Sequence, residues 1–104
     1  MRVFRIVDDS MRPTLQPGDL VVAVRGRRPR RNQLRVFPDP RLSTRWLVKR
    51  VGEVYRSDRS VIFEACSDNP AAPGAVDSHE FGWVPAENSY RVVWRYRPPS
   101  TGDC

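Results

Sequence analysis

Ser10 and Lys49 are the two residues whose types and surroundings most suggest chemistry. Ser10 opens the run Ser10-Met11-Arg12-Pro13-Thr14-Leu15, which follows an apolar stretch and leads into the turn Pro17-Gly18-Asp19. A serine at such a break exposes its hydroxyl and the nearby backbone N–H groups, although serines also cap ordinary turns. A serine hydroxyl becomes a good nucleophile when a neighbouring base takes its proton, and a neutral lysine amine is one such base.

Lys49 is the single lysine of a chain that contains 17 arginines. Arginine stays protonated at every relevant pH, whereas a buried lysine can lose its proton. Because side chains alternate along a strand, Lys49 shares one face with Leu47 and Val51. If that face is buried, desolvation lowers the pKa of the amine and yields the neutral form that a general base needs. The alternative is a lysine that snorkels from an edge strand.

The elements that must position these residues are β-strands. Short β-type runs alternate with Pro, Gly, Asn and Asp, and no segment shows a sustained helical period. The pattern predicts an all-β fold, a small twisted sheet or open barrel. In the last run, the even-numbered residues from Tyr90 to Tyr96 share one face, which indicates a half-buried strand. The predicted strands are Arg2 to Val7, Asp19 to Val24, Leu34 to Phe37, Trp46 to Tyr55, Val61 to Ala65 and Tyr90 to Arg97.

Length and composition bound the protein further. With 104 residues and 12.0 kDa, we expect one domain over residues 1–97 and a disordered tail over residues 98–104. The net charge of +6 favours anionic partners. No stretch approaches the roughly 18 apolar residues that span a bilayer, so we expect a cytoplasmic protein, with peripheral membrane association left open. We expect no cofactor and no metal site, because two cysteines and one histidine show no ligand spacing.

A third segment makes the pattern recognisable. It contains Ser67-Asp68-Asn69-Pro70 and then Asp77-Ser78-His79-Glu80-Phe81-Gly82-Trp83-Val84-Pro85. Together with the boxes around Ser10 and Lys49, it resembles the type I signal peptidase family, whose boxes read S-M-x-P-T-L-x-x-G-D, a strand ending in K-R-V, G-D-N, D-S-R and F-G-x-V-P. The resemblance implies that Ser10 attacks the scissile carbonyl, that Lys49 is the base, and that the fold is the signal peptidase β-core shared with self-cleaving repressor domains.

A short signal-peptidase-like chain without a membrane anchor that contains D-N-P, D-S and F-G-x-V-P, as this chain does, is most similar to the maturation proteases of nickel-type superoxide dismutase. The resemblance therefore implies a serine endopeptidase whose partner is a precursor protein, such as a nickel superoxide dismutase, from which it removes a short N-terminal leader. The runner-up within the same class is a self-cleaving or regulatory domain of the repressor type.

The chain departs from the family pattern beside the nucleophile. Asp8 stands where the family usually has Ser or Gly associated with the oxyanion hole. A carboxylate cannot donate a hydrogen bond, so we expect the hole to rest on backbone N–H groups such as that of Ser10, with Asp8 and Met11 adjacent to the substrate.

The chain also departs from the family around Asp77. Ala75 takes the place of a serine that hydrogen-bonds the lysine, and His79 replaces an arginine, which would make any ion pair there depend on pH. The resemblance leaves Asp77 and Ser78 as supporting residues.

Two other readings use different residues. Cys66 with His79 as its base would make a thiol enzyme, although a cysteine beside Ala65 in an apolar strand is more often a small core residue. The arginine-rich run Arg25 to Arg31 suggests a basic β-module that binds nucleic acid or anionic lipid, or a surface that attracts an acidic substrate. Nucleic acid is the less expected partner, because no aromatic residues are interleaved for base stacking.

Overall fold

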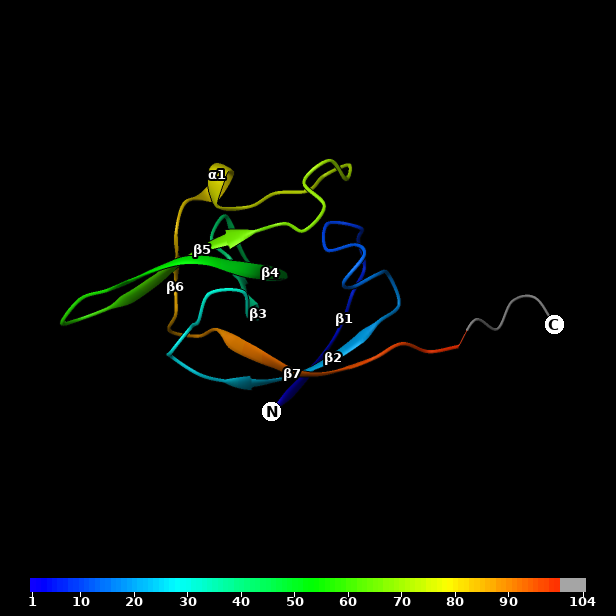
Figure 1. Cartoon of the computed structure of the whole chain (residues 1–104), viewed down its shortest axis with the longest axis horizontal. Coiled ribbons are helices and arrows are strands. Elements are labelled where there is room, and N and C mark those ends of the chain that lie inside the picture. Colours follow the sequence, from blue (N-terminus) through cyan, green and yellow to red (C-terminus); the bar gives the residue numbers. More distant parts are fainter. Residues whose placement is uncertain (100–104) are drawn as a thin grey trace.

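The computed structural model describes residues 1–99, which form one antiparallel sheet of seven strands and one short helix (Figure 1). The strands are β1 (Arg2–Arg5), β2 (Leu20–Arg25), β3 (Leu34–Asp39), β4 (Leu42–Arg56), β5 (Val61–Cys66), β6 (Val84–Pro85) and β7 (Tyr90–Tyr96), and helix α1 is Ser78–Phe81. Their order in the sheet is β1-β2-β7-β3-β4-β5-β6, so β1 and β6 lie at its two ends and the sheet is not closed. The all-β prediction is confirmed.

The six predicted strands all form, and the two elements that were missed are very short. Strand β6 has two residues, too few for an alternation to be visible. Helix α1 is a single turn that begins at a capping box: Asp77 accepts a hydrogen bond from the His79 N–H, and Glu80 accepts one from the Asp77 N–H. Five of the seven residues of the predicted tail, residues 100–104, lie outside the described residues. No helix within residues 1–99 is long and apolar enough to cross a membrane.

Strand β4 connects the two parts of the core. It pairs with β3 as far as Arg50, and from Arg50 onward it pairs with β5. Two hydrophobic clusters form the core, and β4 contributes to both: Leu47 and Val51 belong to the first, and Trp46 and Val48 pack against the second. The first consists of Phe37, Leu47, Val51, Phe63, Ala65, Val84 and Ala86, and the second of Ile6, Met11, Leu15, Val21, Ala23 and Val36.

The face of β4 that carries Lys49 is the buried one. Leu47, Lys49 and Val51 are 5%, 2% and 1% exposed, while their neighbours Val48 and Arg50 are half-buried. The alternation along β4 therefore directs the Lys49 side chain into the interior. This is the arrangement that the sequence predicts if the Leu47 face is buried. The apolar neighbours on either side of the amine account for its desolvation.

The prediction of one continuous half-buried face on β7 is only partly right. Val92 and Trp94 pair with adjacent residues of β2, which leaves Val93 between them without a partner there. This β-bulge interrupts the alternation of side chains, because one strand contains an extra residue. Val92 before the bulge is half-buried, whereas Trp94 and Tyr96 after it are 60% and 51% exposed.

Candidate active site

Ser10 and Lys49 meet in the interior of the protein. The Lys49 Nζ lies 2.9 Å from the Ser10 Oγ, which is hydrogen-bond distance. Ser10 is 3% exposed and Lys49 is 2% exposed, so both polar groups are withdrawn from bulk water. The loop after β1 supplies the hydroxyl and the middle of β4 supplies the amine. The two residues that the sequence singles out for nucleophilic chemistry are thus brought into contact.

The surroundings of Lys49 favour its neutral form. Burial lowers the pKa of the amine, and this effect exceeds the opposing attraction of the Asp8 and Asp77 carboxylates, while the charge of Arg45 lowers the pKa further. None of the described carboxylates lies within ion-pair distance of the Lys49 Nζ. A buried amine without an ion-pair partner gives up its proton more readily than an exposed one, which suits it to act as a base.

Ser67 contacts the Lys49 amine and was not identified from the sequence. Its Oγ accepts a second hydrogen bond from the Lys49 Nζ at 3.0 Å and donates to the Val76 carbonyl oxygen at 3.4 Å. It therefore makes the contact that the resemblance assigns to a serine at the position of Ala75. The sequence signal was present, because Ser67 begins the Ser67-Asp68-Asn69-Pro70 box directly after β5.

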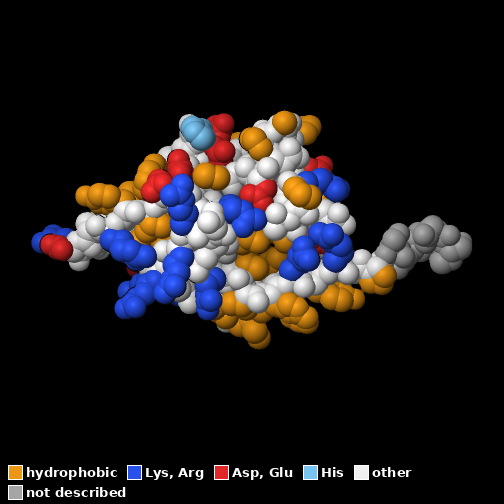
Figure 2. Space-filling model, in the orientation of Figure 1, with side chains coloured by type: hydrophobic (Ala, Val, Ile, Leu, Met, Phe, Trp, Pro, Cys, Tyr) orange, Lys and Arg blue, Asp and Glu red, His pale blue; other side chains and the backbone are white. Residues whose placement is uncertain are grey.

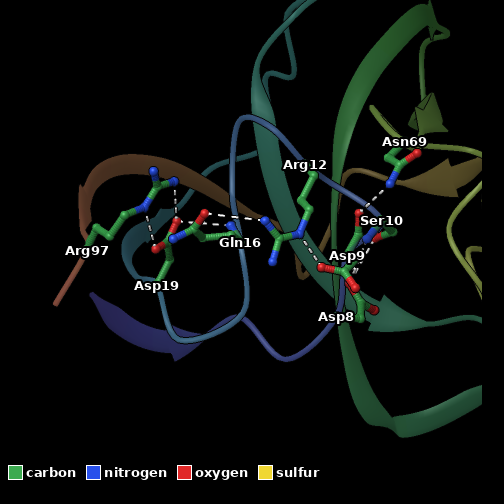
Figure 3. A network of polar contacts seen from close by, with 8 residues as sticks. All are labelled: Asp8, Asp9, Ser10, Arg12, Gln16, Asp19, Asn69 and Arg97. Carbon is green, nitrogen blue, oxygen red and sulfur yellow. Dashed lines mark hydrogen bonds and ion pairs between the residues drawn. The ribbon is translucent and has the colours of Figure 1, made fainter. Parts of the chain in front are cut away.

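The loop that carries Ser10 is anchored to the end of β7, as Figure 3 shows. Arg97 donates to both carboxylate oxygens of Asp19 at 2.9 Å, and the Gln16 N–H donates to the same carboxylate at 3.1 Å. The hydrogen bond from Arg97 is the main cause that lowers the pKa of the buried Asp19 carboxyl. Gly18, with φ of +95°, makes the turn that brings Asp19 back to β1.

The segment after β5 holds the other side of the same loop. The Asn69 N–H donates to the Ser10 carbonyl oxygen at 2.8 Å, and its side-chain amide donates to the Asp9 carbonyl oxygen at 3.1 Å (Figure 3). Asp68 accepts from Thr14 Oγ1 at 2.7 Å and from Arg50 at 2.9 and 2.7 Å. Arg50 is the neighbour of Lys49 on β4, so one network joins the nucleophile loop to the strand of the base.

Asp8 occupies the position where an oxyanion hole was expected. Its Oδ1 accepts hydrogen bonds from the Ser10 N–H at 3.2 Å and from the Ser10 Oγ at 3.0 Å. The backbone donor that the sequence favours for the hole is therefore engaged by a carboxylate. Met11 lies beside it, but its side chain is 1% exposed and packs in the core, where its Sδ accepts from the Asp68 N–H at 3.4 Å.

Asp77 and Ser78 support the fold near the site and do not touch the Ser10–Lys49 pair. The Ser78 hydroxyl bridges the backbone of Ala65 in β5, donating to its carbonyl oxygen at 3.0 Å and accepting from its N–H at 3.2 Å. Asp77 caps α1 and lies 2.9 Å from the His79 Nδ1, an interaction that raises the pKa of the exposed imidazole. The expected pH-dependent pair is thus formed by these two neighbours.

A groove of about 280 Å³ leads to Ser10 and Lys49. One wall is β1 with its continuation, Phe4 to Asp8, and the other is the Arg45 to Lys49 part of β4. Both walls have a free backbone edge among the described residues, because β1 pairs only with β2, and β4 pairs only with β3 before Arg50. An extended peptide placed in the groove can therefore form main-chain hydrogen bonds with either strand.

The residues of the alternative thiol mechanism are less well disposed. Burial raises the pKa of the Cys66 thiol, and the charge of Glu64 adds to this effect, so the thiolate that would attack is disfavoured. The His79 imidazole is directed to Asp77. Within residues 1–99 there is also no group of three or more His, Cys, Asp or Glu side chains arranged to hold a metal ion.

Comparison of the chain with known proteins found no matching family model, no matching curated protein and no matching solved structure.

Proposed function

We propose that the protein is a serine endopeptidase in which Ser10 is the nucleophile and Lys49 the general base. The observation that carries the proposal is the 2.9 Å contact between the Lys49 Nζ and the Ser10 Oγ, both buried, in a chain with a single lysine. The lowered pKa of Lys49 supports the same role, because a base must be neutral before it can accept a proton.

The reaction follows from these contacts. The Lys49 amine takes the hydroxyl proton of Ser10 as the Oγ attacks the carbonyl carbon of the scissile peptide bond, which gives a tetrahedral oxyanion and an ammonium group. The ammonium then returns the proton to the departing amine, and the C–N bond breaks to leave an ester on Ser10. A water molecule that gives its proton to Lys49 attacks the ester, and the acid product leaves as the Ser10 hydroxyl is restored. Ser67 positions the amine through both steps.

Asp8 imposes a condition on this reaction. The Ser10 N–H can stabilise the oxyanion only when it is released from the Asp8 carboxylate, which accepts it at 3.2 Å in the free protein. We infer that a bound peptide displaces the Asp8 side chain from the Ser10 N–H. The enzyme without substrate is then held in a less reactive arrangement, with the Ser10 hydroxyl donating to Asp8.

The groove of about 280 Å³ accommodates an extended peptide along its two strand walls. The signal peptidase resemblance favours small side chains next to the scissile bond. Arg5 and Arg45 line the groove and favour an acidic peptide. In line with the signal peptidase resemblance, we propose that the substrate is the N-terminal leader of a precursor protein, such as a nickel superoxide dismutase, processed in the cytoplasm.

The test is to incubate the protein with a nickel superoxide dismutase precursor and with a secretory preprotein, without detergent, and to sequence the new N-termini by mass spectrometry. We expect cleavage of the precursor after a small residue, abolished by Ser10→Ala and reduced below about a tenth by Lys49→Arg, which keeps the charge but removes the base. Cys66→Ala is the matched control and should remain active. Cleavage confined to the protein's own chain would favour the repressor-type alternative, and activity in Ser10→Ala would refute the proposal.

A further inference from the structure

A second hollow, of about 620 Å³, lies between the β2–β3 connection and β7. It shares no lining residue with the groove beside Ser10. Figure 2 shows a cluster of Lys and Arg side chains at the lower left, over the connection between β2 and β3. We call this feature the arginine hollow, because its lining contains Arg25, Arg27, Arg28, Arg30, Arg35 and Arg91.

Arg35 at the base of the arginine hollow is a buried charge without a counter-ion. The residue is 1% exposed, yet its hydrogen bonds go to neutral acceptors: the Ser89 Oγ at 3.0 and 2.8 Å, the Gly26 carbonyl oxygen, and the Gln33 Oε1 at 3.4 Å. None of the described carboxylates forms an ion pair with it. Burial and the charge of Arg91 lower the pKa of Arg35 to about 10, which leaves it cationic at neutral pH.

The other buried charges show how unusual this is. The buried carboxylates Asp19 and Asp39 each pair with an arginine, and Lys49 is the residue that the proposed reaction uses. Buried charges are ordinarily paired because desolvation of a lone ion costs several kcal/mol. Arg35 is buried at the bottom of an open hollow, and its four hydrogen bonds leave one of the five N–H donors of a guanidinium unused among the described residues. An anion in the hollow would supply the missing charge.

The composition of the lining defines the ligand class. Six arginines and no acidic residue face one small volume, so the ligand must carry several negative charges close together. Guanidinium groups bind phosphate oxygens in paired hydrogen bonds. Val24 is the one large apolar side chain in the lining, and no aromatic side chain is present to stack on a base or to hold an apolar side chain of a peptide. These features favour a compact group with more than one phosphate.

We propose that the arginine hollow is a binding site for a multiply charged phosphoryl ligand, with Arg35 as the buried anchor and Arg91 and the Arg25–Arg30 segment as its clamp. The ligand is either a soluble oligophosphate or the headgroup of a phosphorylated lipid, which present the same chemistry. The site is separate from the proposed peptidase site, so binding does not require Ser10.

Inorganic tripolyphosphate is the probe for the soluble source, measured by titration calorimetry at about 0.15 M salt, where long-range attraction is screened. Vesicles of phosphatidylcholine, with and without a phosphatidylinositol bisphosphate, test the lipid source by co-sedimentation. We expect tripolyphosphate to bind with an affinity that falls about tenfold or more in Arg91→Ala and in the double variant Arg27→Ala/Arg28→Ala. If the protein sediments with vesicles that contain the bisphosphate but not with phosphatidylcholine vesicles, and the same variants no longer sediment, the lipid headgroup is a source of the ligand.

Arg31→Ala is the matched control, because Arg31 belongs to the same arginine-rich run but pairs with Glu53 outside the lining. It removes the same charge and should change the affinity less than about threefold. Arg35→Met should abolish binding, and its thermal unfolding curve will show whether it folds; Arg91→Ala, on another strand, tests the proposal independently. Ser10→Ala should bind as the wild type does. Equal losses in Arg31→Ala and Arg91→Ala, binding of neither tripolyphosphate nor the bisphosphate vesicles, or tighter binding of single-stranded oligonucleotides would overturn the proposal.

Discussion

Replacing Asp8 by serine tests the electrostatics of the proposed site. The Asp8 carboxylate attracts the ammonium form of Lys49 and so raises the pKa of the amine against the stronger effect of burial. Asp8→Ser removes this attraction, frees the Ser10 N–H and introduces a hydroxyl that can donate a hydrogen bond. We therefore expect the acid limb of the kcat/KM profile to move to lower pH, because the neutral amine becomes available at a lower pH.

The structure sets the size of the effect. The contacts of 2.9 Å from Nζ to the Ser10 Oγ and 3.0 Å from that Oγ to the Asp8 Oδ1 place the two charges at most about 5.9 Å apart. At an effective dielectric constant of about 20, two unit charges at that distance attract by about 3 kcal/mol, equivalent to about two pH units. Asp8 lines the open groove and is half-buried, so solvent screens part of this attraction. We expect a displacement of about one pH unit.

The assay is peptide cleavage between about pH 6 and about pH 10 for the wild type, Asp8→Ser and Asp8→Asn, fitted to a single ionisation. Asp8→Asn is the isosteric control, which removes the charge and nearly preserves the shape. Both variants should show the displaced limb. An unchanged limb in both would refute the electrostatic reasoning, and a loss of activity in both at every pH would show that the Asp8 carboxylate takes part in catalysis itself.

Three further predictions concern stability and positioning. Lys49→Met should melt at a higher temperature than the wild type at neutral pH. The lowered pKa of Lys49 destabilises the folded protein only while the amine is protonated in the unfolded chain. The difference in melting temperature should therefore shrink as the pH rises toward about 10. Ser67→Ala should lower kcat about tenfold with little change in KM, since it removes one hydrogen bond to the base, and Ser67→Thr should restore activity. Arg97→Met should be less stable than the wild type at neutral pH, because it removes the ion pair with Asp19. Arg97 lowers the pKa of the Asp19 carboxyl, so this ion pair stabilises the fold above about pH 4 and is lost as acid protonates the carboxylate. Acid titration followed by circular dichroism should therefore show a smaller loss of stability in Arg97→Met than in the wild type.

Local pattern was enough to predict the parts of this protein that depend on neighbours in the chain. The period-two alternation along β4 put Lys49 on the face of Leu47 and Val51, and the structure buries that face. The spacing of β-type runs between turn residues likewise predicted the strands, because alternation and turn chemistry are properties of short segments. The pairing of Ser10 with Lys49 was expected from residue type and box order, and the 2.9 Å contact agrees with it.

The tertiary structure alone decided which groups lie next to those residues. Ser67 bonds the lysine, Asp8 turns back onto Ser10, and Arg35 is buried beside Ser89 without a carboxylate. Each of these contacts depends on the path of a loop or on the register between strands far apart in the sequence. A shift of one residue in register turns a side chain to the opposite face, as the bulge in β7 does, and local sequence does not encode that shift.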